Sequence, residues 1–343
     1  MSPKRWLSFI GLFLAVVLMM WAWRDVSWTH LGQTLQQIHL GWIVLATLTF
    51  LAAFVIRAHR WGLLLPGIEV SFGIRVAAVF IGFAGNCVLP ANAGELVRVG
   101  VLKRRAAVPV AIALGSIVSA RLLDAAIALL FLVGPLLWLP QLQVNNLAIV
   151  ALGLGVVIIY ASFWLAANAP KRIETWVEWI LIHLGLQKRV TTIQPMVRNL
   201  LQGFAVLKSP KALGLALLDT LAVWLLSGIS FWVVLKAFDL TTPGFIGALF
   251  IQSMEALAVV IPSTPGHLGA FEAAVRFALG LYGIQGDSAI GYTLVMRLIM
   301  YGSLSVVGGL FALGLGLSNG HNPINDTPET RLSKTDSLMP PDV

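Results

Sequence analysis

Two short stretches of this sequence place an acid and an arginine one helical turn apart within apolar surroundings. The first stretch has Glu95 and Arg98, and the second has Glu272 and Arg276. Residues three or four positions apart share one face of a helix, so each pair can neutralise itself or face a common ligand. Arginines hold phosphate and carboxylate groups well, while the acids balance charge or accept a proton. The chemistry that these residues favour is anion binding.

A further arginine follows each stretch at nearly the same distance. Arg121 comes 26 residues after Glu95, and Arg297 comes 25 residues after Glu272. Asp124 lies three residues after Arg121, again on one helix face. The matched spacing indicates two copies of one unit, which together could bring up to four arginines to a phosphate-bearing head group.

Helix-breaking residues precede the acid in both copies. They form a helix-break motif with neighbouring polar residues: Asn86, Pro90, Asn92 and Gly94 in the first copy, and Pro262, Pro265, Gly266, His267 and Gly269 in the second. We expect Asn92 and Glu95 to form a capping box. Thr264 followed by Pro265 suits the start of the second half-helix. The N–H groups exposed at such helix starts carry partial positive charge, which makes each start a ready anion site.

The composition indicates which elements must position these residues. Of 343 residues, 58% are apolar and 11% are charged, against about 25% charged in soluble domains. Long apolar runs satisfy their backbone polar groups as helices in a bilayer, whereas barrel strands would alternate. The sequence therefore predicts an all-α polytopic membrane protein. The net charge of +8 fits basic cytoplasmic loops better than nucleic acid binding. Cys87 is the only cysteine, which excludes an internal disulfide, and we expect no metal and no cofactor.

Apolar runs predict about eight membrane segments. The first, at residues 6–23, follows two basic residues and is expected to be a retained helix rather than a signal peptide. The other runs cover residues 40–56, 76–97, 106–140, 146–167, 212–235, 243–283 and 289–318. We expect a single membrane domain at residues 1–318, a cytoplasmic loop at 171–211 and a disordered cytoplasmic tail at 319–343.

Basic residues cluster between these segments and set their orientation. The clusters are Lys4 with Arg5; Arg57, Arg60 and Arg75; Arg98 with residues 103–105; the loop; and the tail. If all are cytoplasmic, segment 76–97 starts and ends inside, and segment 243–283 starts and ends outside. The apolar part of the first, residues 76–89, is only 14 residues long and too short to span. We therefore expect two re-entrant or broken-helix hairpins related as an inverted repeat, with halves at about 57–140 and 240–318, as in alternating-access transporters.

A purely structural interpretation of the charged residues stays open. Pairs such as Glu95 with Arg98, or Arg121 with Asp124, can serve only to neutralise charge between packed helices. In this interpretation, the prolines and glycines of the helix-break motif kink helices and contact no ligand.

Other residues in the apolar runs give weaker signals. His267 has no partner motif, which favours its interpretation as a polar residue of the helix break over a catalyst or a metal ligand. Glu255 and Asp219 are acids inside apolar runs, for which a structural and a functional role are equally open. The glycines at 302–316 favour close helix packing over nucleotide binding, because no strand precedes them.

Taken in order, these motifs resemble the lysylphosphatidylglycerol synthase transmembrane-region family, also called the flippase-like or UPF0104 integral membrane family. The matching residues are Asn86, Pro90, Gly94, Glu95, Arg98, Arg121, Asp124, Ile261, Pro262, Pro265, Gly266, Leu268, Gly269, Glu272 and Arg297. The resemblance covers about residues 40–318. It implies roughly eight membrane segments and a role in moving or handling lipids. In bifunctional relatives, it implies flipping of an aminoacylated phospholipid made by an attached synthase.

Two features distinguish this chain from the family pattern. Its longest polar stretch, at 171–211, has no room for a synthase domain, so we expect a stand-alone member without aminoacyl transfer. Asn92 stands where arginine is frequent, and His267 stands where glycine is frequent. Both lie at the expected site, which implies a different head group.

We therefore expect a lipid flippase-like transporter, not an enzyme, that moves an anionic or phosphate-linked lipid between leaflets of the cytoplasmic (inner) membrane of a prokaryote, with both termini cytoplasmic. The expected substrate-binding residues are Asn92, Glu95, Arg98, Arg121, Asp124, His267, Glu272, Arg276 and Arg297. One alternative is a membrane-embedded lipid-modifying enzyme with Glu95, Glu272 or His267 as acid or base. Another is an accessory partner of a separate lipid synthase. The expected partners are membrane lipids with anionic head groups, and either a second copy of the chain or that synthase. We expect no binding of nucleic acid.

Overall fold

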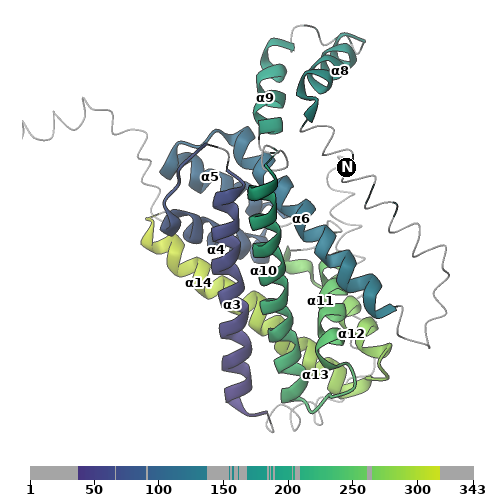
Figure 1. The fold of residues 1–343 in the computed structure, drawn as a ribbon. Helices are drawn as coiled ribbons and strands as arrows, with labels where there is room; N and C mark the ends of the chain where they lie inside the picture. The colour runs from purple at the N-terminus through teal and green to yellow at the C-terminus, as the bar shows by residue number, and fades with distance from the viewer. Residues whose placement is uncertain are drawn as a thin grey trace, which may run out of the picture.

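The computed structural model describes residues 38–65, 67–89, 92–136, 168–183, 190–202, 209–260 and 265–316, together with single positions between some of these ranges (Figure 1). Within them, every regular element is a helix. The expected first helix at 6–23, most of the run at 146–167 and the tail at 319–343 lie outside the described residues.

Four stretches of helix are long and apolar enough to cross a membrane. They are α3 (Leu40–Leu63), α6 (Val110–Leu136), α10 (Pro210–Ala237) and a continuous rod made of α13 (Gly286–Arg297), the π-helical turn η4 (Leu298–Gly302) and α14 (Ser303–Gly314). Each exceeds the roughly 20 residues that a bilayer requires. Helices α3 and α10 lie side by side along their length (Figure 1). The predicted helical membrane architecture is confirmed at this level.

Two pairs of shorter helices interrupt this pattern. Helices α4 (Phe72–Val88) and α5 (Gly94–Ala106) form the first pair. Helices α11 (Gly244–Val260) and α12 (Ala270–Gly280) form the second, with the 3₁₀ turn η3 (Pro265–His267) between them. Each helix is shorter than a membrane span, and each pair is separated by the breaker residues that the sequence predicted. The two helix pairs overlap segments 76–97 and 243–283, where the sequence predicts the two hairpins.

Helix α3 extends further than its apolar run, and this corrects the interpretation of one basic cluster. The run at 40–56 continues as helix through Arg57 and Arg60 to Leu63. Arg60 is 1% exposed. These two arginines therefore belong to the helical bundle and not to a surface loop, because they pair with an acid on α6, as described below.

The helix starts after the two breaks differ from the predicted caps. Helix α5 has Ala93 as its N-cap and no side-chain capping bond, so the expected capping box of Asn92 and Glu95 does not form. Asn92 has φ of 56°, and its left-handed backbone lies one residue before the cap. In the second break, Pro265 opens only the 3₁₀ turn. Helix α12 starts after Gly269, whose N–H donates to Glu272 Oε2 at 2.8 Å.

Glycines allow the first pair of helices to pack with backbones in contact. A Cβ at Gly94 would collide with the Gly82 carbonyl oxygen and with Asn86. On α14, a Cβ at Gly308 would collide with Ala84 and come 3.0 Å from the carbonyl carbon of Phe80. Small residues of this kind permit close helix approach in membranes. For Gly308, this matches the predicted packing role of the glycines at 302–316.

The predicted cytoplasmic loop contains two amphipathic helices, α8 (Pro170–His183) and α9 (Val190–Gln202). They pack against each other at one end of the bundle, and α9 also contacts α6 (Figure 1). Arg198 of α9 pairs with Glu174 of α8 at 2.9 Å. This hydrogen bond lowers the pKa of the Glu174 carboxyl below its ordinary value.

Candidate functional site

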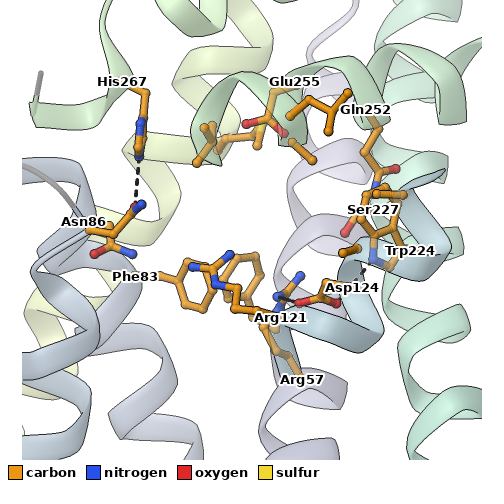
Figure 2. A pocket seen from close by; sticks show the side chains of 18 of the residues that line it. Arg57, Phe83, Asn86, Arg121, Asp124, Trp224, Ser227, Gln252, Glu255 and His267 are labelled. Atoms are coloured by element: carbon orange, nitrogen blue, oxygen red, sulfur yellow. Dashed lines mark hydrogen bonds and ion pairs between the residues drawn. The ribbon is translucent and has the colours of Figure 1, made fainter. Parts of the chain in front are cut away.

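The helices enclose a cavity of about 550 Å³, within the range typical of small-ligand sites. Its walls come from α3, α4, α5, α6, α10, α11, α14 and the turns η3 and η4. Aromatic and aliphatic side chains cover most of its surface, including Phe50, Phe54, Phe83, Leu122, Phe231 and Met300. Polar side chains from several helices converge on the same space (Figure 2).

Arg121 pairs with Glu95 at the cavity wall. Arg121 Nε donates to Glu95 Oε1 at 2.8 Å, and its Nη2 donates to the same oxygen. The pair joins α6 to α5, so the 26-residue spacing seen in the sequence corresponds to a contact between helices.

Glu95 does not pair with Arg98, its neighbour on the same helix. The Arg98 guanidinium instead lies over the Trp61 ring, with Cζ 3.6 Å from the ring centroid. Arg98 is buried, and its Nε has no hydrogen-bond partner in the described part of the chain. Arg98 therefore packs between helices instead of lining the cavity, because the aromatic face attracts its charge.

Asp124 is the centre of an ion-pair network between helices. Arg60 donates to it through Nη1 at 2.7 Å and Nη2 at 3.1 Å, and Arg57 Nη1 donates at 3.1 Å. The Trp224 indole donates at 3.3 Å from α10. The spacing in the sequence allowed Asp124 to pair with Arg121. In the structure, Asp124 pairs instead with Arg57 and Arg60 of α3. Asp124 and Arg57 line the cavity, whereas Arg60 lies behind them.

Glu272 and Arg297 form the corresponding contact in the second copy. Arg297 Nη1 lies 2.6 Å from Glu272 Oε1, and its Nη2 donates to the Gly266 carbonyl at 2.7 Å. The Arg297 guanidinium also lies 4.7 Å from the Tyr301 ring centroid. This pair fixes the second break and does not line the cavity. Arg276 does not line it either.

The two helix breaks meet at one side of the cavity. His267 Nε2 lies 3.2 Å from Asn92 Oδ1. Both residues have positive φ, 51° and 56°, which an L-residue rarely adopts. Gly266 lies close to the first hairpin, since a Cβ there would come 3.0 Å from the Cys87 carbonyl oxygen. Residues 175 positions apart therefore form one junction.

Six of the predicted site residues line the cavity. They are Asn86, Asn92, Glu95, Arg121, Asp124 and His267. Gly94 and Gly269 start the two half-helices, as described above, whereas Pro90 and Pro262 lie outside the described residues.

The prediction missed several polar residues of the cavity. Arg57 lines the cavity, although its basic cluster predicts a loop, and Gln252, Ser227 and Trp224 line it without any sequence signal that predicts this. Glu255 was noted only as an acid in an apolar run. Figure 2 shows Glu255 on one wall of the cavity, across from Arg121 and Arg57. Its position inside a continuous apolar run was the one signal that could have identified it.

The cavity is suited to bind an anion that carries an apolar chain. Arg57 and Arg121 supply positive charge, and the aromatic and aliphatic walls suit acyl or prenyl groups. Among the described residues, no cluster of three His, Cys, Asp or Glu side chains is placed to hold a metal ion.

Comparison with known proteins agrees with the motifs. The family model described as the lysylphosphatidylglycerol synthase TM region matches residues 8–308. A UPF0104 membrane protein of Methanothermobacter thermautotrophicus is 22% identical over 329 residues, 91% of this chain and 93% of that protein. A protein named glycosyltransferase AglD, from Haloferax volcanii, is 24% identical over 298 residues, 78% of this chain and 48% of that protein. No solved structure matches the chain. The resemblance predicted from the motifs is confirmed.

Proposed function

The chain belongs to the lysylphosphatidylglycerol synthase transmembrane-region family, and from its cavity we propose that it is a flippase-like transporter for an anionic or phosphate-linked lipid. In this proposal the cavity binds the head group while the protein moves the lipid between leaflets of the cytoplasmic membrane of a prokaryote. Both termini then lie in the cytoplasm, as the basic clusters favour.

The observation that carries the proposal is the surplus of positive charge around an apolar cavity. Four arginines, two of them on the cavity wall, lie near one another: Arg57, Arg60, Arg98 and Arg121. Among the described residues, Glu95 and Asp124 are the acids that neutralise them through the ion pairs described above. Even with Glu255 ionised, one positive charge remains. Burying uncompensated charge in a membrane is costly, so a bound anion would complete the site.

The geometry of the hairpins supports a transport cycle. In our proposal α4 with α5 enters the membrane from the cytoplasm, and α11 with α12 enters from outside, as an inverted repeat within about eight membrane segments. Their breaks meet at the contact between Asn92 and His267. Broken helices that meet near the midplane are typical of alternating-access transporters. Movement of either hairpin against the other would open the cavity to one leaflet at a time.

A transport assay with purified full-length protein in liposomes tests the proposal. Wild-type protein should move fluorescent phosphatidylglycerol between leaflets, and Arg121→Ala or Glu95→Gln should abolish this movement. Arg198→Gln is the matched control, because Arg198 makes its ion pair on α9, away from the cavity. Each variant is first checked for helix content and a single gel-filtration peak. Movement that survives both cavity substitutions would rule out this site.

A second candidate function follows from one comparison. The chain matches 48% of the protein named glycosyltransferase AglD, so the matched region there is joined to further sequence. This supports, as a second candidate beside transport, an accessory role next to a separate lipid synthase or a lipid-modifying enzyme. Lipids extracted from a deletion strain separate these functions. A missing lipid product would indicate an enzyme or its partner, whereas a normal product confined to the inner leaflet would indicate transport.

A further inference from the structure

Glu255 differs from the other acids of the cavity because it has no partner among the residues that the structure describes. Its side chain lines the cavity from α11 and is 7% exposed. In the described ranges, no hydrogen bond or ion pair reaches its carboxylate, whereas Glu95 and Asp124 are both paired with arginines. Glu272 also has an arginine partner. The acids that the sequence offers as proton acceptors are thus neutralised by arginines. Among the described acids of the cavity, Glu255 is the remaining candidate to bind a proton.

The three arginines near enough to act on Glu255 in the described ranges each pair with a different acid. These arginines are Arg57, Arg121 and Arg297. They contact Asp124, Glu95 and Glu272 respectively.

The elements packed against α11 offer Glu255 no ion-pair partner of their own. Helix α6 presents Arg121 and Asp124 to the cavity, α10 presents Trp224 and Ser227, and α12 carries Glu272 and Arg276. Arg57 lies across the cavity from Glu255, and His267 is also on the wall (Figure 2). Glu95 and Tyr301 line the cavity as well. An ionised Glu255 is therefore stabilised by the surplus positive charge of the site and by no direct contact.

We propose that Glu255 is a proton-binding site coupled to the anion site, so that one proton binds to its carboxylate when an anionic head group binds at Arg57 and Arg121. This inference rests on the proposed function. The head group offsets the positive charge of Arg57 and Arg121, and it places a further negative charge in the same buried space, so both effects favour the protonated Glu255 carboxyl. A proton from water then forms an O–H bond at the Glu255 carboxylate. No other covalent bond changes, and the proton returns to water when the lipid leaves.

This coupling gives the transporter a way to use a proton gradient. Linkage is reciprocal, so protonation of Glu255 strengthens head-group binding as much as the head group favours protonation. A singly charged head group and one proton add no net charge to the cavity. The loaded site can therefore cross the bilayer without carrying additional charge.

Calorimetry of lipid binding tests the inference directly. Short-chain dihexanoyl phosphatidylglycerol is titrated into full-length protein between pH 6 and 9.5, in two buffers that differ in ionisation enthalpy. Binding to wild-type protein should take up close to one proton at some pH in this range. Because the bound state holds more protons, affinity should fall as pH rises, by at most about tenfold per pH unit. Glu255→Gln should abolish proton uptake and leave an affinity that does not change with pH.

Asp219→Asn is the matched control. Asp219 is also an acid within an apolar helix, but it pairs with His59 at 2.7 Å and does not line the cavity. It should keep the proton uptake of the wild type.

Four outcomes would overturn the inference. Wild-type binding without proton uptake at any pH would refute it while leaving the lipid site intact, and this result does not depend on any variant folding. Proton uptake that persists in Glu255→Gln would assign the proton to another group. If Glu255→Gln instead weakens only lipids that carry an amine, Glu255 contacts the ligand as a counter-ion. A failure of wild-type protein to bind at every pH would refute the proposed function as well.

Discussion

Replacing Asp124 by asparagine should destabilise the bundle far more than replacing Asp219. Asp124 accepts three arginine hydrogen bonds from α3 and one from the Trp224 indole of α10. Four interhelical bonds at about 0.6 kcal/mol each amount to roughly 2.4 kcal/mol. Loss of the carboxylate also leaves the buried Arg60 without its counter-ion, which raises the expected loss towards about 3–5 kcal/mol.

Unfolding in mixed micelles of a mild detergent and sodium dodecyl sulfate measures this loss, with far-UV circular dichroism and tryptophan fluorescence as probes. Asp219→Asn is the control, because its histidine partner is 59% exposed and such pairs contribute at most about 1 kcal/mol. The reasoning would be refuted if the two variants lost the same free energy of unfolding, since Asp124 would then not hold α3, α6 and α10 together.

Two further predictions concern packing and access. Gly94→Ala should reduce the yield of folded protein and its transport activity, because a Cβ at this position collides with Gly82 and Asn86, whereas Gly100→Ala on the same helix meets nothing within 4 Å. Gel filtration and the liposome assay compare the two, and equal behaviour would contradict close packing of α4 and α5. Cys87 lines the cavity and is the only cysteine, so phosphatidylglycerol should slow its labelling by a maleimide relative to phosphatidylcholine. Mass spectrometry follows the labelling, and equal rates in the two lipids would argue against head-group binding beside Cys87.

Long-range contacts of the site were predictable where the same spacing occurs twice. The intervals from Glu95 to Arg121 and from Glu272 to Arg297 correspond to ion pairs between helices. Membrane helices allow this because a charge in an apolar run needs a partner, and few partners exist.

Local pairing was less predictable, because positions three residues apart suggest a contact that packing can override. Arg98 turns to Trp61 instead of Glu95. Asp124 takes its partners from α3, which no local pattern relates to it. The counting of positive charges also misplaced Arg57 and Arg60, since a buried arginine and a loop arginine look alike in a sequence.

Because Asn92 and His267 contact each other, we expect a change at one position to require a change at the other. The family resemblance implies a different residue at each of the two positions, and each side chain contacts the other across the two helix breaks. A longer side chain at position 92 needs the space that His267 now fills, and a glycine at 267 would vacate it. The two positions should therefore co-vary among relatives, as arginine with glycine or as asparagine with histidine. Exchanging both residues together should preserve folding better than exchanging either alone.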